Sequence, residues 1–326
     1  MRPRWRSAHT DPVIDISPEL VRALVSSQFP QWGDLPVRAV DRQGWDNRTF
    51  RLGGELTVRL PSAEGYVAAV AKEDRCLPEL ARHVPLPVPE PVAVGAPGAG
   101  YPFAWSVRRW LPGETVEVAT GVGRTRLARD LGDFLTRLRE APVGRGPAAG
   151  RHSYFRGCHP SVYGDEVEAA LERLADSVDV AACRAVWAQA LTSAWPSPPT
   201  WFHGDVSVGN LLTTDGVLSA VIDFGSSGVG DPACDLVIAW NHFTAEERKV
   251  FREAVGLPDD AWRRARGWAL WKALVSTAGL SSPDPEGRQR RVLDQVMEDA
   301  VVQHREPSRT ARTIQRHEGH LGPKPS

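Results

Sequence analysis

The sequence predicts an α+β protein with two lobes, a smaller lobe built on an antiparallel sheet and a larger, mostly helical lobe. Two observations carry this prediction. Residues 1–112 are rich in strand patterns, with apolar and polar residues alternating over residues 37–60, whereas long helical patterns dominate residues 113–305. Pro112 and Gly113 interrupt the chain between these parts and mark the predicted lobe boundary. Residues 306–326 lack apolar periodicity and are expected to form a disordered tail.

The first predicted elements are a helix and a group of strands. Ser17 is a good N-cap, Pro18 suits the first helical turn, and the apolar pattern that follows ends near Phe29. Residues 37–60 then alternate around the turn at Gly53-Gly54. We therefore expect a helix followed by an antiparallel hairpin or meander.

A second helical segment and two more strands complete the smaller lobe. Apolar residues recur at helical spacing over residues 66–83, but Pro78 is expected to kink or break this segment, leaving one or two helices. Residues 84–91 carry a proline at every second position, which forces an extended chain. Two strands are expected on either side of the turn at residues 95–100, the second over residues 103–111.

The larger lobe is predicted to contain long helices and one hairpin. Helical periodicity covers six stretches: residues 125–140, 164–177, 179–195, 244–255, 259–277 and 286–304. Residues 211–212 and 218–222 resemble strands, and Asp215-Gly216 between them is a strong signal for a tight turn.

Composition excludes several functional classes. With 39 basic and 40 acidic residues the net charge is only -1, so nothing attracts nucleic acid or an anionic membrane. The four cysteines form no Cys-x-x-Cys pair, which favours reduced thiols. The longest apolar stretch, residues 268–280, is too short to span a bilayer, and the N-terminus does not resemble a secretory signal. We expect a cytoplasmic protein that binds a small-molecule partner; its oligomeric state stays open.

The predicted hairpin brings together residues that suit phosphoryl transfer. Its turn lies near residue 216, so Asn210 and Asp223 lie at opposite ends of the paired ladder and close together in space. An amide oxygen and a carboxylate are ligands suited to Mg²⁺. Asp205 lies five residues before Asn210, where a second carboxylate can orient an attacking hydroxyl.

Two motifs in this region resemble those of a known family. His203-Gly204-Asp205, with Asn210 five residues later, and Ile222-Asp223-Phe224-Gly225 are similar to the catalytic and metal-binding loops of the aminoglycoside phosphotransferase family, relatives of the protein kinases. Residues 109–114 and 230–236 also match, so the resemblance covers about residues 30 to 245. It implies a two-lobed protein-kinase-like fold. It also implies a kinase that transfers a phosphoryl group from Mg²⁺-bound ATP or GTP to a hydroxyl of an aminoglycoside or similar antibiotic.

The resemblance assigns roles in the larger lobe. Asp205 is expected to be the catalytic base, with Asn210 and Asp223 as the magnesium ligands. His203 is expected to shape the loop through its own hydrogen bonds, and Asp235 to steady the catalytic loop.

In the smaller lobe the resemblance implies a nucleotide site. Residues 44–48, which include Asn47, would cover the nucleotide, Arg59 would contact phosphate, and Glu73 would pair with Arg59. Arg59 stands where protein kinases carry a lysine; its forked guanidinium can serve the same role, although Lys72 is an alternative phosphate contact. Backbone groups near Arg109 and Leu111 would hold the base.

The sequence leaves several alternatives open. The acceptor could instead be a choline-like, homoserine-like or macrolide-like compound, and either ATP or GTP could be the donor. A metal-dependent phosphohydrolase would use His203, Asp205, Asp223 and His242 as ligands to two metals. A non-catalytic nucleotide-binding module is a third class.

Overall fold

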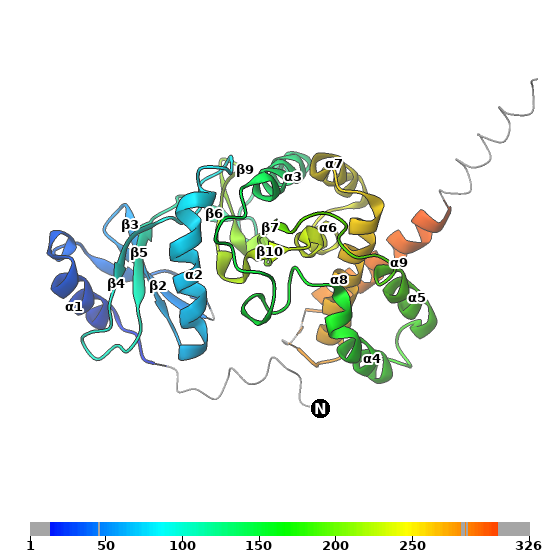
Figure 1. Ribbon diagram of the computed structural model, residues 1–326, viewed down its shortest axis with the longest axis horizontal. Coiled ribbons are helices and arrows are strands. Elements are labelled where there is room, and N and C mark those ends of the chain that lie inside the picture. The colour runs from blue at the N-terminus through cyan, green and yellow to red at the C-terminus, as the bar shows by residue number, and fades with distance from the viewer. Residues whose placement is uncertain (1–13, 45, 282–283, 285, 306–326) are drawn as a thin grey trace, which may run out of the picture. The chain divides into compact units, whose positions relative to one another are not determined.

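The computed structural model describes residues 14–44, 46–281, 284 and 286–305 (Figure 1). The chain forms two compact units, Met1–His159 with Trp195–Ala261 and Pro160–Ala194 with Trp262–Ser326. The predicted lobe boundary at residues 112 and 113 falls inside the first unit and stays a prediction, and the predicted tail at 306–326 lies outside the described residues. Within the described residues, no helix is both long enough and apolar enough to cross a membrane.

A five-stranded antiparallel sheet forms the first part of the first unit. Its strands are β1 (Val37–Ala39), β2 (Asn47–Leu52), β3 (Leu56–Pro61), β4 (Pro91–Gly95) and β5 (Trp105–Arg109), in the order β1-β2-β3-β5-β4. The turn between β2 and β3 uses Gly53 at a positive φ of 62°, a conformation that glycine adopts without steric cost. The meander predicted from the alternating pattern is confirmed.

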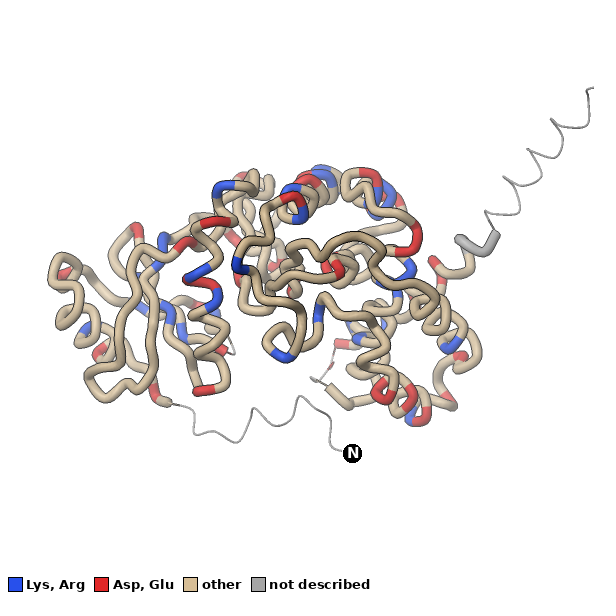
Figure 2. The backbone as a smooth tube through the Cα atoms, viewed as in Figure 1, with Lys and Arg blue, Asp and Glu red and all other residues tan. Residues whose placement is uncertain are grey.

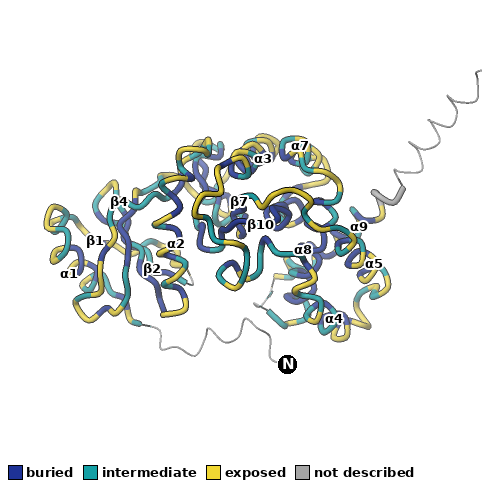
Figure 3. The backbone as a smooth tube through the Cα atoms, in the orientation of Figure 1, coloured by how far each residue is buried: buried dark blue, intermediate teal, exposed yellow. Residues whose placement is uncertain are grey.

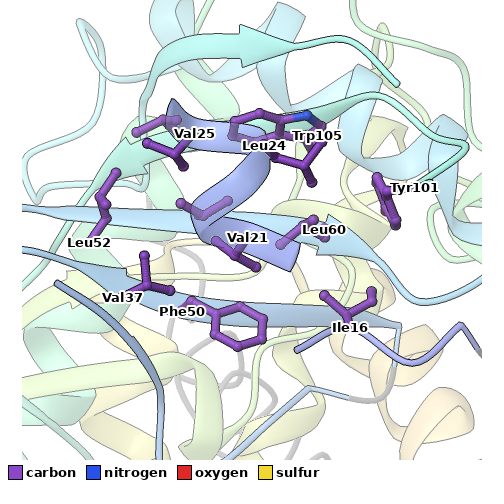
Figure 4. Packing of buried hydrophobic residues seen from close by; sticks show 12 residues of the cluster. Ile16, Val21, Leu24, Val25, Val37, Phe50, Leu52, Leu60, Tyr101 and Trp105 are labelled. Atoms are coloured by element: carbon purple, nitrogen blue, oxygen red, sulfur yellow. The ribbon is translucent and has the colours of Figure 1, made fainter. Parts of the chain in front are cut away.

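Both faces of this sheet are covered. Helix α1 (Pro18–Gln28) begins at Ser17, whose side chain accepts a hydrogen bond from the N–H of Leu20. Figure 4 shows apolar side chains of α1 packed with strand residues of the sheet, among them Phe50, Leu60 and Trp105. Because strand side chains alternate between faces, the intervening residues point to the opposite face, where α2 (Glu64–Leu80) packs against β3, β4 and β5.

Helix α2 is a single element that runs through Pro78. The proline lies only two residues before the end of the helix, so it removes one hydrogen bond from the last turn instead of dividing the segment. The predicted break does not occur for this reason.

The remaining part of the first unit surrounds a short hairpin. Strands β8 (Leu211–Thr214) and β9 (Val217–Val221) pair across the Asp215-Gly216 turn, whose residues have φ of 52° and 74°. The predicted hairpin is confirmed, and β6 (Glu114–Thr115) adds a third strand to it. Strands β7 (Thr200–Phe202) and β10 (Gly228–Gly230) form a separate buried pair (Figure 3).

Helices α3 (Arg124–Glu140), α6 (Ile238–Asn241) and α7 (Ala245–Val255) complete the first unit, and α3 packs along α7. Thr244 and Glu247 form a capping box at the start of α7, and Gly256 ends it in a left-handed conformation. Arg124 joins α3 to α7 through a hydrogen-bonded ion pair with Glu247 at 2.9 Å.

The second unit is helical. Its helices are α4 (Gly164–Arg173), α5 (Val180–Ala190), α9 (Arg288–Arg305) and the greater part of α8 (Asp259–Thr277). All the predicted helices are present, although α4 and α5 end several residues earlier than the periodicity suggests. Buried tryptophans of α8 and a buried ion pair at 2.8 Å between Arg266 and Asp299 stabilise this unit.

Candidate active site

The hairpin positions Asn210 and Asp223 together at its open end. Leu211 is paired with Val221, and the N–H of Ile222 donates to the backbone oxygen of Asn210 at 2.9 Å. Asp223 directly follows and adopts a left-handed φ of 64°, a conformation that aspartate tolerates better than most residues. The turn predicted from Asp215-Gly216 therefore produces the juxtaposition that the sequence argument required.

Asp205 lies beside Asn210 on the loop between β7 and the short helix at Val208–Asn210. The side-chain amide of Asn210 donates to the backbone oxygen of Asp205 at 2.9 Å and to its Oδ2 at 3.0 Å. These bonds hold one carboxylate oxygen of Asp205 while the residue stays exposed. Within the described part of the chain no hydrogen bond or ion pair engages the second carboxylate oxygen, which can therefore meet a small molecule.

His203 is a buried structural residue of this loop. Its Nε2 lies 3.0 Å from the backbone oxygen of Ile222, and because a carbonyl only accepts, Nε2 carries the proton. Its Nδ1 then accepts from the N–H of Asp205 at 3.2 Å. The imidazole thus joins the segment before Asp223 to the start of Asp205, with neither nitrogen left for a metal.

Asp235 holds the same loop through hydrogen bonds to its backbone. Its two carboxylate oxygens accept from the N–H groups of His203 at 2.8 Å and Gly204 at 2.7 Å. Burial raises the pKa of Asp235, and these hydrogen bonds act against that rise. Gly204 has a φ of 84°, and a Cβ there would lie 2.6 Å from the backbone oxygen of Ser226, so the approach requires glycine.

Arg59 of β3 connects the sheet to the metal-ligand candidate. Its Nη1 lies 3.1 Å from Oε1 of Glu73, and its Nη2 donates to Oδ1 of Asp223 at 2.9 Å. Burial alone would lower the pKa of Arg59, but the charges of Glu73 and Asp223 raise it above its ordinary value. Burial conversely acts to raise the pKa of Asp223, and the charge and hydrogen bond of Arg59 outweigh it and lower that pKa.

Lys72, the alternative phosphate contact, is engaged elsewhere. Its ammonium donates to the backbone oxygens of Gly225 at 2.6 Å and Ser227 at 2.7 Å, and the residue is 3% exposed. Burial lowers the pKa of Lys72 to about 8. Lys72 therefore attaches α2 to the segment after Asp223, and Arg59 contacts the carboxylate of Asp223.

Two charged residues near Glu73 were not singled out from the sequence. Arg108 of β5 is 1% exposed and donates to Asp74 at 2.8 Å, and its Nη1 lies 3.4 Å from Oε2 of Glu73. Figure 2 shows the acidic and basic positions side by side along α2. The alternation of side chains along the strand could have indicated this position, because Val107 faces the apolar core and the next residue, Arg108, therefore faces α2.

The segment expected to cover the nucleotide contributes two polar side chains. Asn47 is 2% exposed, and its amide nitrogen and oxygen both lack a hydrogen-bond partner among the described residues. Asp46 lies near Gly225, and burial together with the nearby charge of Asp223 raises its pKa. Trp45 of the same segment lies outside the described residues. A buried amide without partners is costly, so Asn47 is suited to a polar ligand.

Other predicted contacts lie at the margin of this cluster. Arg109 ends β5, and Leu111 follows two residues later, where the chain leaves the sheet. A further link, not foreseen from the sequence, is the 2.6 Å ion pair between Arg42, before the covering segment, and Glu117. The N–H of Glu117 donates to the backbone oxygen of Val208, so the pair connects the chain just before the covering segment to the catalytic loop.

The donor set fits a hard divalent cation. The Nδ2 group of Asn210 is engaged with Asp205, which leaves its amide oxygen available, and Arg59 engages Oδ1 of Asp223, which leaves Oδ2. One amide oxygen and one carboxylate suit Mg²⁺, which takes the rest of its shell from water and phosphate. In the described part of the chain there is no cluster of three or more His, Cys, Asp and Glu that could hold a metal without such help.

The chain is similar to known phosphotransferases. Residues 38–268 match the model of a family described as the phosphotransferase enzyme family. No curated protein matches the chain. Among solved structures, the chain is similar to the GDP complex of aminoglycoside 2'-phosphotransferase-IIIa, with 19% identity, a TM-score of 0.64, and coverage of 87% of this chain and 100% of that one.

Two other similar structures differ in their ligands. Macrolide 2'-phosphotransferase MphH from Brachybacterium faecium, an apoenzyme, has 19% identity and a TM-score of 0.59, with 86% of this chain and 97% of that chain covered. The ternary complex of streptomycin, ATP and APH(2")-IIa has 15% identity and a TM-score of 0.57, with 87% and 97% covered. At these identities the likeness demonstrates the shared α+β kinase-like fold.

Proposed function

This chain belongs to the phosphotransferase enzyme family and is a small-molecule phosphotransferase, and from that premise we propose that it is an antibiotic kinase. The reaction transfers the γ-phosphoryl group of a magnesium nucleoside triphosphate to a hydroxyl of an aminoglycoside or a similar antibiotic. One observation carries the phosphoryl-transfer part of the proposal: Asp205, Asn210, Asp223 and Arg59 meet at the open end of one hairpin. The antibiotic acceptor is proposed from the similar aminoglycoside and macrolide phosphotransferase structures.

Asp205 serves as the base in this proposal. Its exposed carboxylate accepts the proton of the acceptor hydroxyl as the new bond to phosphorus forms and the bond to the β-phosphate oxygen breaks. The bond from Asn210 at 3.0 Å orients the carboxylate, and Asp235 and His203 hold its loop in place. Phosphoryl transfer depends mainly on positioning and charge, which this loop supplies.

Arg59, Asn210 and Asp223 form the phosphate end of the site. Bound Mg²⁺, held by Asn210 and Asp223, would neutralise charge on the phosphates. The guanidinium of Arg59 offers a fixed positive charge beside the same carboxylate, with a fork suited to phosphate oxygens. The buried amide of Asn47 supplies a donor and an acceptor to the nucleotide, and backbone groups near Arg109 and Leu111 hold the base.

The donor nucleotide is ATP or GTP in this proposal. The similar structures support either one, since aminoglycoside 2'-phosphotransferase-IIIa was solved with GDP and APH(2")-IIa with ATP and streptomycin. A macrolide is the second candidate acceptor, because structures of two macrolide 2'-phosphotransferases are also similar to this chain.

A phosphohydrolase with two metals is disfavoured by the hydrogen bonds of His203. Both its ring nitrogens are used within the protein, so this proposed ligand is not available.

The test is an acceptor panel. Purified protein with Mg²⁺ and either ATP or GTP is incubated with aminoglycosides, macrolides, choline and homoserine, and the phosphorylated product is identified by mass spectrometry. Product with an aminoglycoside supports the proposal, whereas product only with choline or homoserine contradicts the assignment of an antibiotic acceptor.

A further inference from the structure

Five charged side chains form a continuous row through the first unit. The order is Asp74, Arg108, Glu73, Arg59 and Asp223, with N–O distances of 2.8, 3.4, 3.1 and 2.9 Å along it. Charges alternate from one member to the next. The row joins β5, α2 and β3 to the candidate metal ligand.

The sheet register explains why both arginines face α2. In the β3–β5 ladder Arg59 is opposite Ser106, and Thr57 is opposite Arg108. Arg59 and Arg108 are therefore diagonal neighbours on one face, close enough to share a partner. Glu73 supplies that partner, with Oε1 toward Arg59 and Oε2 toward Arg108.

Arg108 is held firmly behind Glu73. Its Nη2 donates to Asp74 at 2.8 Å, and its Nε donates to Oγ of Ser106 at 3.0 Å. The side chain is 2% exposed, and that of Glu73 is fully buried. Among the described residues, Oε2 of Glu73 and Nη1 of Arg108 form no hydrogen bond and meet only as an ion pair at 3.4 Å, so each depends on the charge of the other.

The single positive charge of Arg59 lies among three carboxylates, those of Glu73, Asp223 and Asp46. The pKa of Arg59 is raised by the charges of Glu73, Asp223 and Asp46. A second cation on the other oxygen of Glu73 balances part of this charge and keeps Glu73 directed along the row. Arg59 then retains a donor for phosphate and for Asp223.

We propose that Arg108 is a positioning residue for nucleotide binding and phosphoryl transfer, acting through Glu73 on Arg59, with Asp74 holding Arg108 in place. This inference rests on the proposed function for its catalytic part. It differs from a purely structural role because the effect of Arg108 must pass through Glu73.

The test compares Arg108→Met, Arg108→Lys, Glu73→Gln and the double variant Glu73→Gln with Arg108→Met. The affinity for a fluorescent mant-ATP or mant-GTP with Mg²⁺ is measured for each, together with kcat/KM for the nucleotide. We expect Arg108→Met to lower kcat/KM by roughly 10- to 100-fold and to weaken nucleotide binding. Arg108→Lys restores part of this loss, and the double variant is no worse than Glu73→Gln alone.

Arg266→Met is the matched control. It removes a buried arginine from an aspartate at 2.8 Å, as Arg108→Met does, but in the second unit. It should lower thermal stability and leave nucleotide affinity unchanged, measured well below the unfolding midpoint of each variant.

Two outcomes overturn the inference: unchanged nucleotide affinity in Arg108→Met, or losses that multiply in the double variant. Wild-type protein that binds nucleotide but phosphorylates no acceptor would contradict the proposed function, while the affinity measurements would still decide the role of Arg108.

Discussion

Replacing Arg59 with methionine tests the electrostatic centre of the site. The side chain is 11% exposed and contacts the carboxylates of Glu73 at 3.1 Å and Asp223 at 2.9 Å. Removing one partner from a buried ion pair costs about 3 to 5 kcal/mol, because the other charge stays buried without compensation. The Asp223 side chain is 33% exposed, so solvent screens its share, and we expect a loss near the lower value, about 3 kcal/mol.

The assay combines urea unfolding with nucleotide binding. Arg59→Lys keeps the charge but lacks the fork that reaches two carboxylates, so its unfolding free energy should fall by only about 1 to 2 kcal/mol. Arg38→Met is the control, because Arg38 lies exposed on β1 of the same sheet. A loss in Arg59→Met no larger than that of the control, with nucleotide affinity unchanged, would refute the reasoning.

Two further predictions concern the hydrogen bonds of Asp235 to the catalytic loop and the ion pair that joins α3 to α7. In Asp235→Asn, an amide nitrogen replaces one of the two oxygens that accept hydrogen bonds from the N–H groups of His203 and Gly204. The free energy of unfolding should therefore fall by about 2 to 4 kcal/mol, and kcat should fall with it. Equal stability of the variant and wild type in urea unfolding would contradict this prediction. The hydrogen bond from Arg124 lowers the pKa of Glu247 to about 2 from 4.5, so its contribution is present above pH 4.5 and lost as pH falls toward 2. The Arg124 side chain is 40% exposed, so solvent screens the pair, and Glu247→Gln should lower the free energy of unfolding by about 1 to 2 kcal/mol at pH 7. The difference from wild type, measured by urea unfolding, should shrink as the pH falls from 4.5 to about 2. A difference that does not change with pH would contradict this prediction.

The sequence was informative where the signals are local. The Asp215-Gly216 turn by itself defines the hairpin, and the hairpin brings Asn210 to Asp223. The start of α1 followed from the cap at Ser17. These features depend on residues within a few positions of one another, so the sequence pattern suffices.

The contacts between distant segments were harder to predict. Strands β6, β7 and β10 have two or three residues each, too few for a periodic pattern, and they exist because of partners far along the chain. A lone arginine in a strand, such as Arg108, is more often exposed than buried, and only its register against β3 brings it to Glu73. Lys72 was similarly ambiguous, since its carbonyl partners lie 153 and 155 residues away.

The most direct test of the central claim compares wild type with Asp205→Asn. Asn keeps the size of the side chain but cannot accept a proton from the hydroxyl, so kcat for transfer to the identified acceptor should fall by about 100-fold or more. Affinity for mant-nucleotide with Mg²⁺ should stay close to wild type, because Arg59, Asn210 and Asp223 remain. Full acceptor-dependent turnover in Asp205→Asn would contradict the assignment of Asp205 as the base.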